Sequence, residues 1–122
     1  MDQEVGQMES FTKRAMQIHA LYDEFNLSAR GRAWSREESM LGFVGDVGDL
    51  AKIVMALEGV RSYPAVSLDG ALAHELADCL WSVLVLARLY GVDLEQAFTQ
   101  TMSDLETQIG SDLQRPQTEV NG

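Results

Sequence analysis

Two pairs of carboxylate residues are the features of this sequence most able to do chemistry. Asp46 and Asp49 form the first pair, and Glu75 and Asp78 form the second. On an α-helix, residues three apart lie on the same face one turn apart, so each pair stacks and points in one direction. Hard divalent cations such as Mg²⁺ prefer oxygen ligands, so the two pairs together could hold about one to three such ions.

The sequence around both pairs is apolar. Leu50 follows Asp49, and the run Cys79–Trp81 follows Asp78, so both pairs border surfaces expected to be buried. Burying neighbouring ionised carboxylates is unfavourable, and a bound divalent cation removes the conflict. The alternative is a solvated helix face, because most Asp and Glu residues are exposed. The pattern alone leaves both interpretations open.

Helical periodicity and helix-capping patterns predict the elements that position these pairs. Ser35 with Glu38, and Asp93 with Gln96, are capping-box patterns that mark helix starts. The predicted helices run from about Met8 to Asn26, from Ser35 to Gly59, from after Gly70 to Tyr90, and from Leu94 to about Ile109. Without strand-like alternation of useful length, the chain is predicted to be an all-α, four-helix bundle.

Length and charge restrict the class of protein. The 122 residues suit a single domain, predicted over residues 1–110, followed by a polar tail over 111–122 that we expect to be flexible. A net charge of -10 argues against binding of DNA or RNA through basic residues. An acidic protein can still bind a small polyphosphate when metal ions lie between its carboxylates and the phosphate oxygens.

Cysteine usage and hydropathy predict a cytoplasmic protein without a membrane partner. Cys79 is the only cysteine, so an intrachain disulfide is impossible, and its apolar neighbours predict a buried thiol. The sequence starts without the basic and apolar regions of a signal peptide. The longest apolar run, Leu80–Ala87, is interrupted by Ser82 and is too short to span a bilayer.

Two further patterns concern helix packing. The third predicted helix is apolar on most of its circumference, which suggests an additional layer, most simply a second subunit. Gly42, Gly45 and Gly48 recur every three residues in the second predicted helix, although glycine is unfavourable there. We favour a tight helix crossing at these glycines over backbone clearance for a ligand.

The acidic segments resemble a known family. Val44–Ala51, followed by Glu75–Asp78, resembles the paired acidic motif of the MazG-like, all-α nucleoside triphosphate pyrophosphohydrolases, whose first pair is Glu-x-x-Glu and second is Glu-x-x-Asp. Val92–Ala97 is similar to the turn that leads into the family's last core helix. The Gly-Asp-x-Gly-Asp-Leu segment resembles the dCTP pyrophosphatase-like branch, and the similarity covers about residues 25–102.

The resemblance implies a fold, a cofactor and a reaction. It implies a MazG-like bundle assembled as a homodimer or a dimer of dimers, with Mg²⁺, or Mn²⁺ as a substitute, held by the catalytic residues Asp46, Asp49, Glu75 and Asp78. Water attack would split a (deoxy)nucleoside triphosphate into the monophosphate and pyrophosphate, which would remove unwanted nucleotides from the pool. No side-chain nucleophile is required.

Departures from the family pattern support an alternative function. Asp46 and Asp49 are each one methylene shorter than the usual glutamates. The last helix carries Thr101, Leu105 and Gln108 where relatives often carry Lys, Asn and a basic residue. The alternative is therefore a catalytically weak MazG-like homologue that binds a nucleotide or a protein partner.

Other residues are candidates for substrate contacts. Trp34 could stack on a nucleobase or could instead staple the start of the second helix, and both interpretations stay open. Lys52, one turn beyond Asp49, could contact phosphate. The arginines of the first loop and the following turn could also supply cations; these are Arg30, Arg32 and Arg36. Each is more often simply a solvated charge. His74 is expected to be a surface residue, or a residue that contacts the metal ligands, and not itself a metal ligand.

Overall fold

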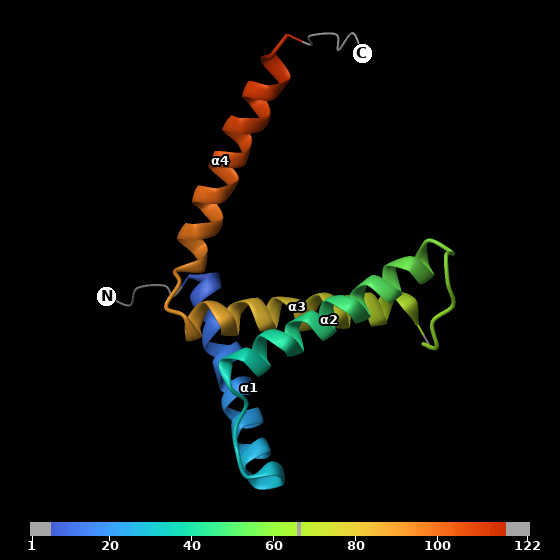
Figure 1. Cartoon of the computed structure of the whole chain (residues 1–122), viewed down its shortest axis with the longest axis vertical. Helices are drawn as coiled ribbons and strands as arrows, with labels where there is room; N and C mark the ends of the chain where they lie inside the picture. Colours follow the sequence, from blue (N-terminus) through green and yellow to red (C-terminus); the bar gives the residue numbers. More distant parts are fainter. Residues whose placement is uncertain (1–5, 66, 117–122) are drawn as a thin grey trace. The chain divides into compact units, whose positions relative to one another are not determined.

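The computed structural model describes residues 6–65 and 67–116. Within these ranges the chain forms four helices and no strand (Figure 1): α1 (Gln7–Arg30), α2 (Arg36–Leu57), α3 (Leu68–Leu89) and α4 (Leu94–Gln114). The predicted all-α fold with four helices is confirmed. The chain divides after Gly91 into two compact units, so α1, α2 and α3 are described together and α4 by itself.

The first unit is built on α2 and α3, which run side by side in opposite directions, with α1 crossing them (Figure 1). Its small core consists of Ala15, Ile53, Leu84 and Val85. Ile53 is fully buried, and burying such a side chain contributes about 1.5–3 kcal/mol. The Trp81 indole N–H donates a hydrogen bond of 3.0 Å to the carbonyl of Ala15, which fixes α1 against α3.

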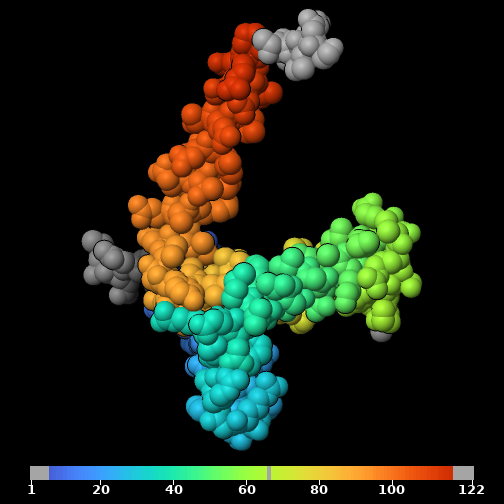
Figure 2. Space-filling model, in the orientation of Figure 1, coloured from blue at the N-terminus to red at the C-terminus, as the bar shows by residue number. Residues whose placement is uncertain are grey.

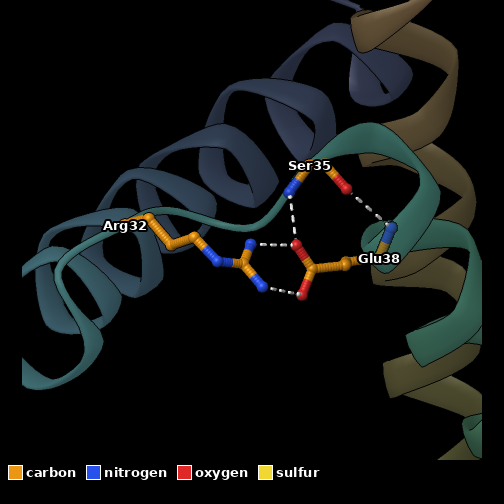
Figure 3. Close-up of polar contacts among 3 residues, drawn as sticks. All are labelled: Arg32, Ser35 and Glu38. Atoms are coloured by element: carbon orange, nitrogen blue, oxygen red, sulfur yellow. Dashed lines mark hydrogen bonds and ion pairs between the residues drawn. The ribbon is translucent and has the colours of Figure 1, made fainter.

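The start of α2 forms as its capping box predicts (Figure 3). The Glu38 backbone N–H donates to Ser35 Oγ at 3.2 Å, and the Ser35 backbone N–H donates to Glu38 Oε1 at 3.1 Å. Arg32 binds the same carboxylate with both terminal nitrogens, one at 3.1 Å from Oε2. The hydrogen bonds from Arg32 and then Ser35 lower the pKa of Glu38 to about 2. The carboxylate therefore fixes the loop before α2.

Two helix boundaries differ from those predicted. α1 continues through Arg30 because Gly31, at φ 79°, is the residue that adopts the left-handed conformation and ends the helix. The helix end predicted at about Asn26 is therefore wrong, and Asn26 lies inside α1. α3 begins earlier than predicted, because the Ser67 hydroxyl accepts a 3.1 Å hydrogen bond from the backbone N–H of Gly70.

The second unit contains α4. The Asp93 carboxylate accepts a 3.1 Å hydrogen bond from the Gln96 backbone N–H, which is half of the predicted capping box. The helix continues past Ile109 to Gln114 and ends before Pro116, which disfavours a helical conformation in the preceding residue. The predicted flexible tail is therefore helical at residues 111–114, and its residues 117–122 lie outside the described ranges. The single domain over residues 1–110 stays a prediction.

Apolar side chains are exposed on the outer faces of α2 and α3. Figure 2 shows the outer surface of α2, teal to green, uncovered by the rest of the first unit. The exposed residues of this face are Met40, Leu41, Val44, Val47, Val54 and Met55, with Leu76 and Leu80 exposed on α3. A Cβ added at Gly45 or Gly48 would meet nothing within 4 Å. The predicted tight crossing at these two glycines is therefore wrong within the described chain.

α3 is also the one described helix that is long and apolar enough to cross a membrane. Length and composition alone do not distinguish such a helix from the core helix of a soluble protein. Leu84 and Val85 of α3 are buried in the core of the first unit, and Glu75 and Asp78 lie in the same helix. These features favour the core-helix interpretation.

Candidate functional site

The antiparallel packing of α2 and α3 brings the four predicted carboxylates together. Asp46, Asp49 and Glu75 each offer an oxygen atom, and these atoms lie within 4.8 Å of one another. Glu75 and Asp78 form a second group of the same size with His74. Because Glu75 belongs to both groups, the four carboxylates form one continuous set, which we name the acidic cluster.

Burial and mutual repulsion perturb the acidic cluster. Burial is the main cause that raises the pKa of Asp46, and the charges of Asp78 and Asp49 raise it further. Burial likewise raises the pKa of Glu75, followed by the charge of Asp78. The cluster is therefore electrostatically unfavourable when all of its members are ionised and no cation is bound.

Glu75 supplies an independent test of whether a cation fits. Its Oε2 atom is buried and has no hydrogen-bond partner among the described residues. A buried carboxylate oxygen without a donor is costly, whereas coordination to a cation satisfies it. The donor set of carboxylate oxygens suits Mg²⁺ or Mn²⁺, so the residues present fit a divalent metal.

Two neighbouring side chains hold the carboxylates in place. The Ser82 hydroxyl, which is buried, donates a hydrogen bond of 3.3 Å to Asp46 Oδ2 across the α2–α3 interface. His74 Nε2 lies 3.2 Å from Asp78 Oδ2, and the His74 side chain is 71% exposed. His74 is thus at the surface beside the cluster, as expected. Ser82 was missed, although a serine one turn after Asp78 in an apolar run is a signal that could have found it.

Cys79 is half-buried rather than buried as predicted. It follows Asp78 directly on α3. Burial raises the pKa of its thiol, and the charges of Asp46 and Glu75 raise it further. A thiol in an acidic environment stays protonated at neutral pH and is a poor nucleophile. The cysteine is therefore unsuited to covalent catalysis.

A cleft of about 550 Å³ adjoins the acidic cluster between α1, α2 and α3. Asp46 and Asp78 of the cluster line it, so the cleft opens onto the carboxylates. Its aromatic lining comes from Tyr22, Phe25, Trp34 and Trp81, and the Tyr22 and Trp81 rings lie 5.6 Å apart in a tilted arrangement. The volume and the mixed apolar and polar lining suit a small organic ligand.

Trp34 lies in the wall of this cleft and is 40% exposed. Its indole packs over Gly42, where an added Cβ would come within 2.7 Å of the Trp34 ring. Gly42 therefore provides room for the indole and not for a helix crossing. The packing anchors Trp34 at the start of α2 and leaves part of the ring exposed to the cleft, which is compatible with both of its predicted roles.

Four polar residues of α1 also line the cleft, and sequence reasoning missed three of them. His19, Asp23, Asn26 and Arg30 recur at steps of three or four, which places them on one helix face. We name this face the α1 wall. His19 Nε2 lies 3.5 Å from Asp23 Oδ2. The periodicity of these polar residues was the available signal, because His19, Asp23 and Asn26 all lie within the predicted helix and only Arg30 lies beyond its predicted end.

The candidate phosphate-contacting cations are separated by the structure. Arg30 lines the cleft. Arg32 is held by Glu38, and the Arg36 guanidinium lies 5.1 Å from the centre of the Tyr90 ring. Lys52 is exposed and is not among the residues that line the cleft. The structure therefore brings only Arg30 of this set to the cleft.

Comparison with known proteins agrees with the sequence motif. A family model described as the MazG nucleotide pyrophosphohydrolase domain matches residues 37–108. The matched segment is more than half of the chain and contains the whole acidic cluster, whereas the α1 wall and Trp34 lie outside it. Searches of curated proteins and of solved structures each gave no match.

Proposed function

Because the chain belongs to the MazG nucleotide pyrophosphohydrolase family, we propose that it hydrolyses a (deoxy)nucleoside triphosphate to the monophosphate and pyrophosphate. The observation that carries this proposal is the acidic cluster within the matched segment, where the buried Glu75 Oε2 has no partner among the described residues. The same cluster supports dependence on Mg²⁺, with Mn²⁺ as a substitute. Removal of unwanted nucleotides is the proposed cellular role.

The side chains have distinct roles in this proposal. Asp46, Asp49, Glu75 and Asp78 would hold the metal, and Ser82 would orient Asp46 through its hydrogen bond. A divalent metal bound there supplies charge neutralisation of the phosphate oxygens and a more acidic water molecule. The proposed hydrolysis breaks the bond between the α-phosphorus and its bridging oxygen, and water supplies the new oxygen on the monophosphate.

The cleft is proposed to bind the nucleoside. Its contact with Asp46 and Asp78 would place the triphosphate over the acidic cluster while the base enters among the aromatic residues. Trp34 would stack on the base, because an indole offers a large flat surface at little entropic cost. Lys52, three residues after Asp49 and outside the cleft, remains a proposed phosphate contact.

We further propose a homodimer or homotetramer in the cytoplasm, with no nucleic acid or membrane partner. The exposed apolar faces of α2 and α3 support assembly, because contiguous exposed apolar surface commonly marks an interface. The buried core of four hydrophobic residues is small for the described chain, which also favours burial against a second copy. The net charge of -10 supports the exclusion of nucleic acid. The finer resemblance to the dCTP pyrophosphatase-like branch stays a prediction.

The alternative proposal is a catalytically weak homologue that binds a nucleotide or a protein partner. The shorter carboxylates Asp46 and Asp49 support it, as do Thr101 and Leu105 on α4, where relatives often carry polar or basic residues. This alternative predicts nucleotide or metal binding without appreciable turnover.

The deciding experiment measures pyrophosphate release from standard and modified nucleoside triphosphates with Mg²⁺, with Mn²⁺ and with chelator. Glu75→Gln removes a cluster carboxylate, and Asp69→Asn is the matched control, because Asp69 is an acidic residue of α3 outside the cluster. The proposal expects metal-dependent release from the parent and the control but not from Glu75→Gln. Equal release from a folded Glu75→Gln variant would overturn the assigned site, and metal binding without release would favour the alternative.

A further inference from the structure

The connection between α1 and α2 carries Trp34 but has few backbone contacts of its own. Within the described ranges, residues 32–34 make no backbone-to-backbone hydrogen bond, and the adjoining bonds are made by Gly31 and Ser35. A short segment without such bonds keeps conformational freedom unless side-chain contacts restrict it. The position of Trp34 therefore depends on the side chains that hold the connection.

Glu38 holds this connection on both sides of Trp34 (Figure 3). Its carboxylate accepts hydrogen bonds from both terminal nitrogens of Arg32, two residues before Trp34, and from the backbone N–H of Ser35, the residue after it. A bidentate arginine–carboxylate pair is directional as well as attractive, so it restricts the chain between its ends. These hydrogen bonds, above all those from Arg32, lower the pKa of Glu38 to about 2, so the pair is ionised at neutral pH.

The other contact of Trp34 is the packing of its ring over Gly42. A Cβ added at Gly42 would lie 2.7 and 3.2 Å from two ring atoms, so the ring lies directly against the backbone of α2. The same ring lines the cleft. A glycine has no side chain to enclose the ring, so the direction of the ring is set largely by the connection that carries it.

We propose that the Arg32–Glu38 pair is a positioning device that holds the Trp34 ring in the wall of the cleft, so that a nucleobase meets a stacking surface already in place. A fixed ring avoids the loss of conformational freedom that ordering the connection on binding would cost. Within the described chain neither Arg32 nor Glu38 lines the cleft, so both act through Trp34 and not by contacting the substrate. The inference rests on the proposed function in assigning a nucleotide to the cleft.

The first test observes Trp34 directly, without substrate or metal. The chain has two tryptophans, so protein labelled with fluorotryptophan gives one fluorine NMR signal for Trp34 and one for Trp81, which Trp34→Phe assigns. Arg32→Met keeps the length of the side chain but removes its donors, and it is expected to shift or broaden the Trp34 signal and to leave the Trp81 signal in place. Glu37→Gln is the matched control, because Glu37 is the other acidic residue in the first turn of α2, whereas Arg32 binds Glu38.

Kinetics of double variants then show whether the position of the ring matters for binding. With Mg²⁺ and a hydrolysed triphosphate, Arg32→Met should raise KM by about threefold and change kcat by less than about twofold, because only substrate binding is weakened. In a Trp34→Ala background, Arg32→Met should leave KM unchanged, since the pair acts through the ring. A direct contribution of the Arg32 charge to phosphate binding would persist in that background and would contradict the inference.

The two measurements separate this inference from the proposed function. A Trp34 signal that responds to Arg32→Met in a chain without turnover supports the positioning role and counts against the proposed hydrolysis alone. An unchanged Trp34 signal overturns the inference whether or not hydrolysis occurs, and so does turnover with an unchanged KM in Arg32→Met. Thermal melting establishes that each variant is folded. If Arg32→Met does not fold, Arg32→Lys, which keeps the charge but not the bidentate contact, takes its place.

Discussion

The acidic cluster and the α1 wall border the same cleft but differ in how well their polar groups are satisfied. In the cluster, carboxylates crowd together, and burial and repulsion raise the pKa of Asp46 and Glu75. In the α1 wall, charges of both signs alternate with a neutral amide, and Asp23 has a neighbouring histidine. The cluster therefore has the charge and donor atoms that suit a bound cation, whereas the wall offers directional hydrogen bonds.

This difference separates two kinds of ligand recognition within one small unit. A divalent cation would relieve the repulsion of the cluster, so occupancy of the cluster should change protein stability as well as activity. A ligand on the wall gains contacts but relieves little repulsion. Variants of the two regions should consequently affect different quantities: metal affinity and turnover for the cluster, and substrate affinity for the wall.

The largest expected effect is from loss of a cluster carboxylate. Asp46→Asn should lower metal-dependent kcat/KM by about 100-fold or more, because metal-ion stabilisation contributes several kcal/mol to such reactions. Steady-state pyrophosphate release measures the effect, and Asp104→Asn on α4 is the control because Asp104 is exposed and outside the cluster. Comparable activity in both variants would show that the cluster does not act as the catalytic centre.

A smaller effect is expected when only the support of the cluster is removed. Ser82→Ala deletes the hydroxyl that donates to Asp46 Oδ2 and should weaken Mn²⁺ binding by about tenfold, as is typical for groups that orient metal ligands. Calorimetric titration with Mn²⁺ measures this change. Unaltered Mn²⁺ affinity would mean that Asp46 keeps its position without Ser82.

On the recognition side, Trp34→Ala should raise KM by about tenfold and leave kcat nearly unchanged, because stacking on a base contributes about 1–3 kcal/mol. Gly42→Ala should raise KM by a few fold, since the new methyl group would displace the indole that packs there. The double variant should be no worse than Trp34→Ala, because both changes act through the same ring. Additive effects would contradict the shared cause.

The smallest expected effect concerns the stability of the metal-free protein. Ionisation of Asp46 and Glu75 is disfavoured in the folded state, because their pKa values are raised above the ordinary 3.8 and 4.5. Their contribution to stability is therefore fully present below those ordinary values and is lost as the pH rises through the raised values. Asp46→Asn should melt at a higher temperature than the parent at pH 7 without metal, and the difference should shrink near pH 4 and on addition of Mg²⁺. A lower melting temperature at pH 7 would contradict the repulsion inferred here.

The acidic cluster was predictable because each of its carboxylate pairs is defined by residues within one helical turn of each other. Three-residue spacing fixes each pair on one helix face, and the order of the two helices along the chain makes an antiparallel arrangement natural. The capping box at Ser35 and Glu38 was equally predictable, since both partners lie within one turn. The match over residues 37–108 confirms the family that these local motifs indicated.

Other features required the tertiary structure. The sequence placed the end of the first helix at about Asn26, and only the continuation of α1 to Arg30 adds Arg30 to the face that carries Asp23 and Asn26. Gly42 resembled part of a crossing surface, but a tryptophan from the preceding loop covers it while Gly45 and Gly48 stay open.

The sequence by itself determined the all-α class, the caps of α2 and the two carboxylate pairs, because backbone capping and helical periodicity act between residues a few positions apart. The tertiary structure decided that Glu75 Oε2 is enclosed without a partner, that Ser82 reaches Asp46, and that α1 closes one side of the cleft. These features depend on the packing of helices distant in sequence. Burial and desolvation arise from that packing, and the spacing of residues along the sequence does not reveal them.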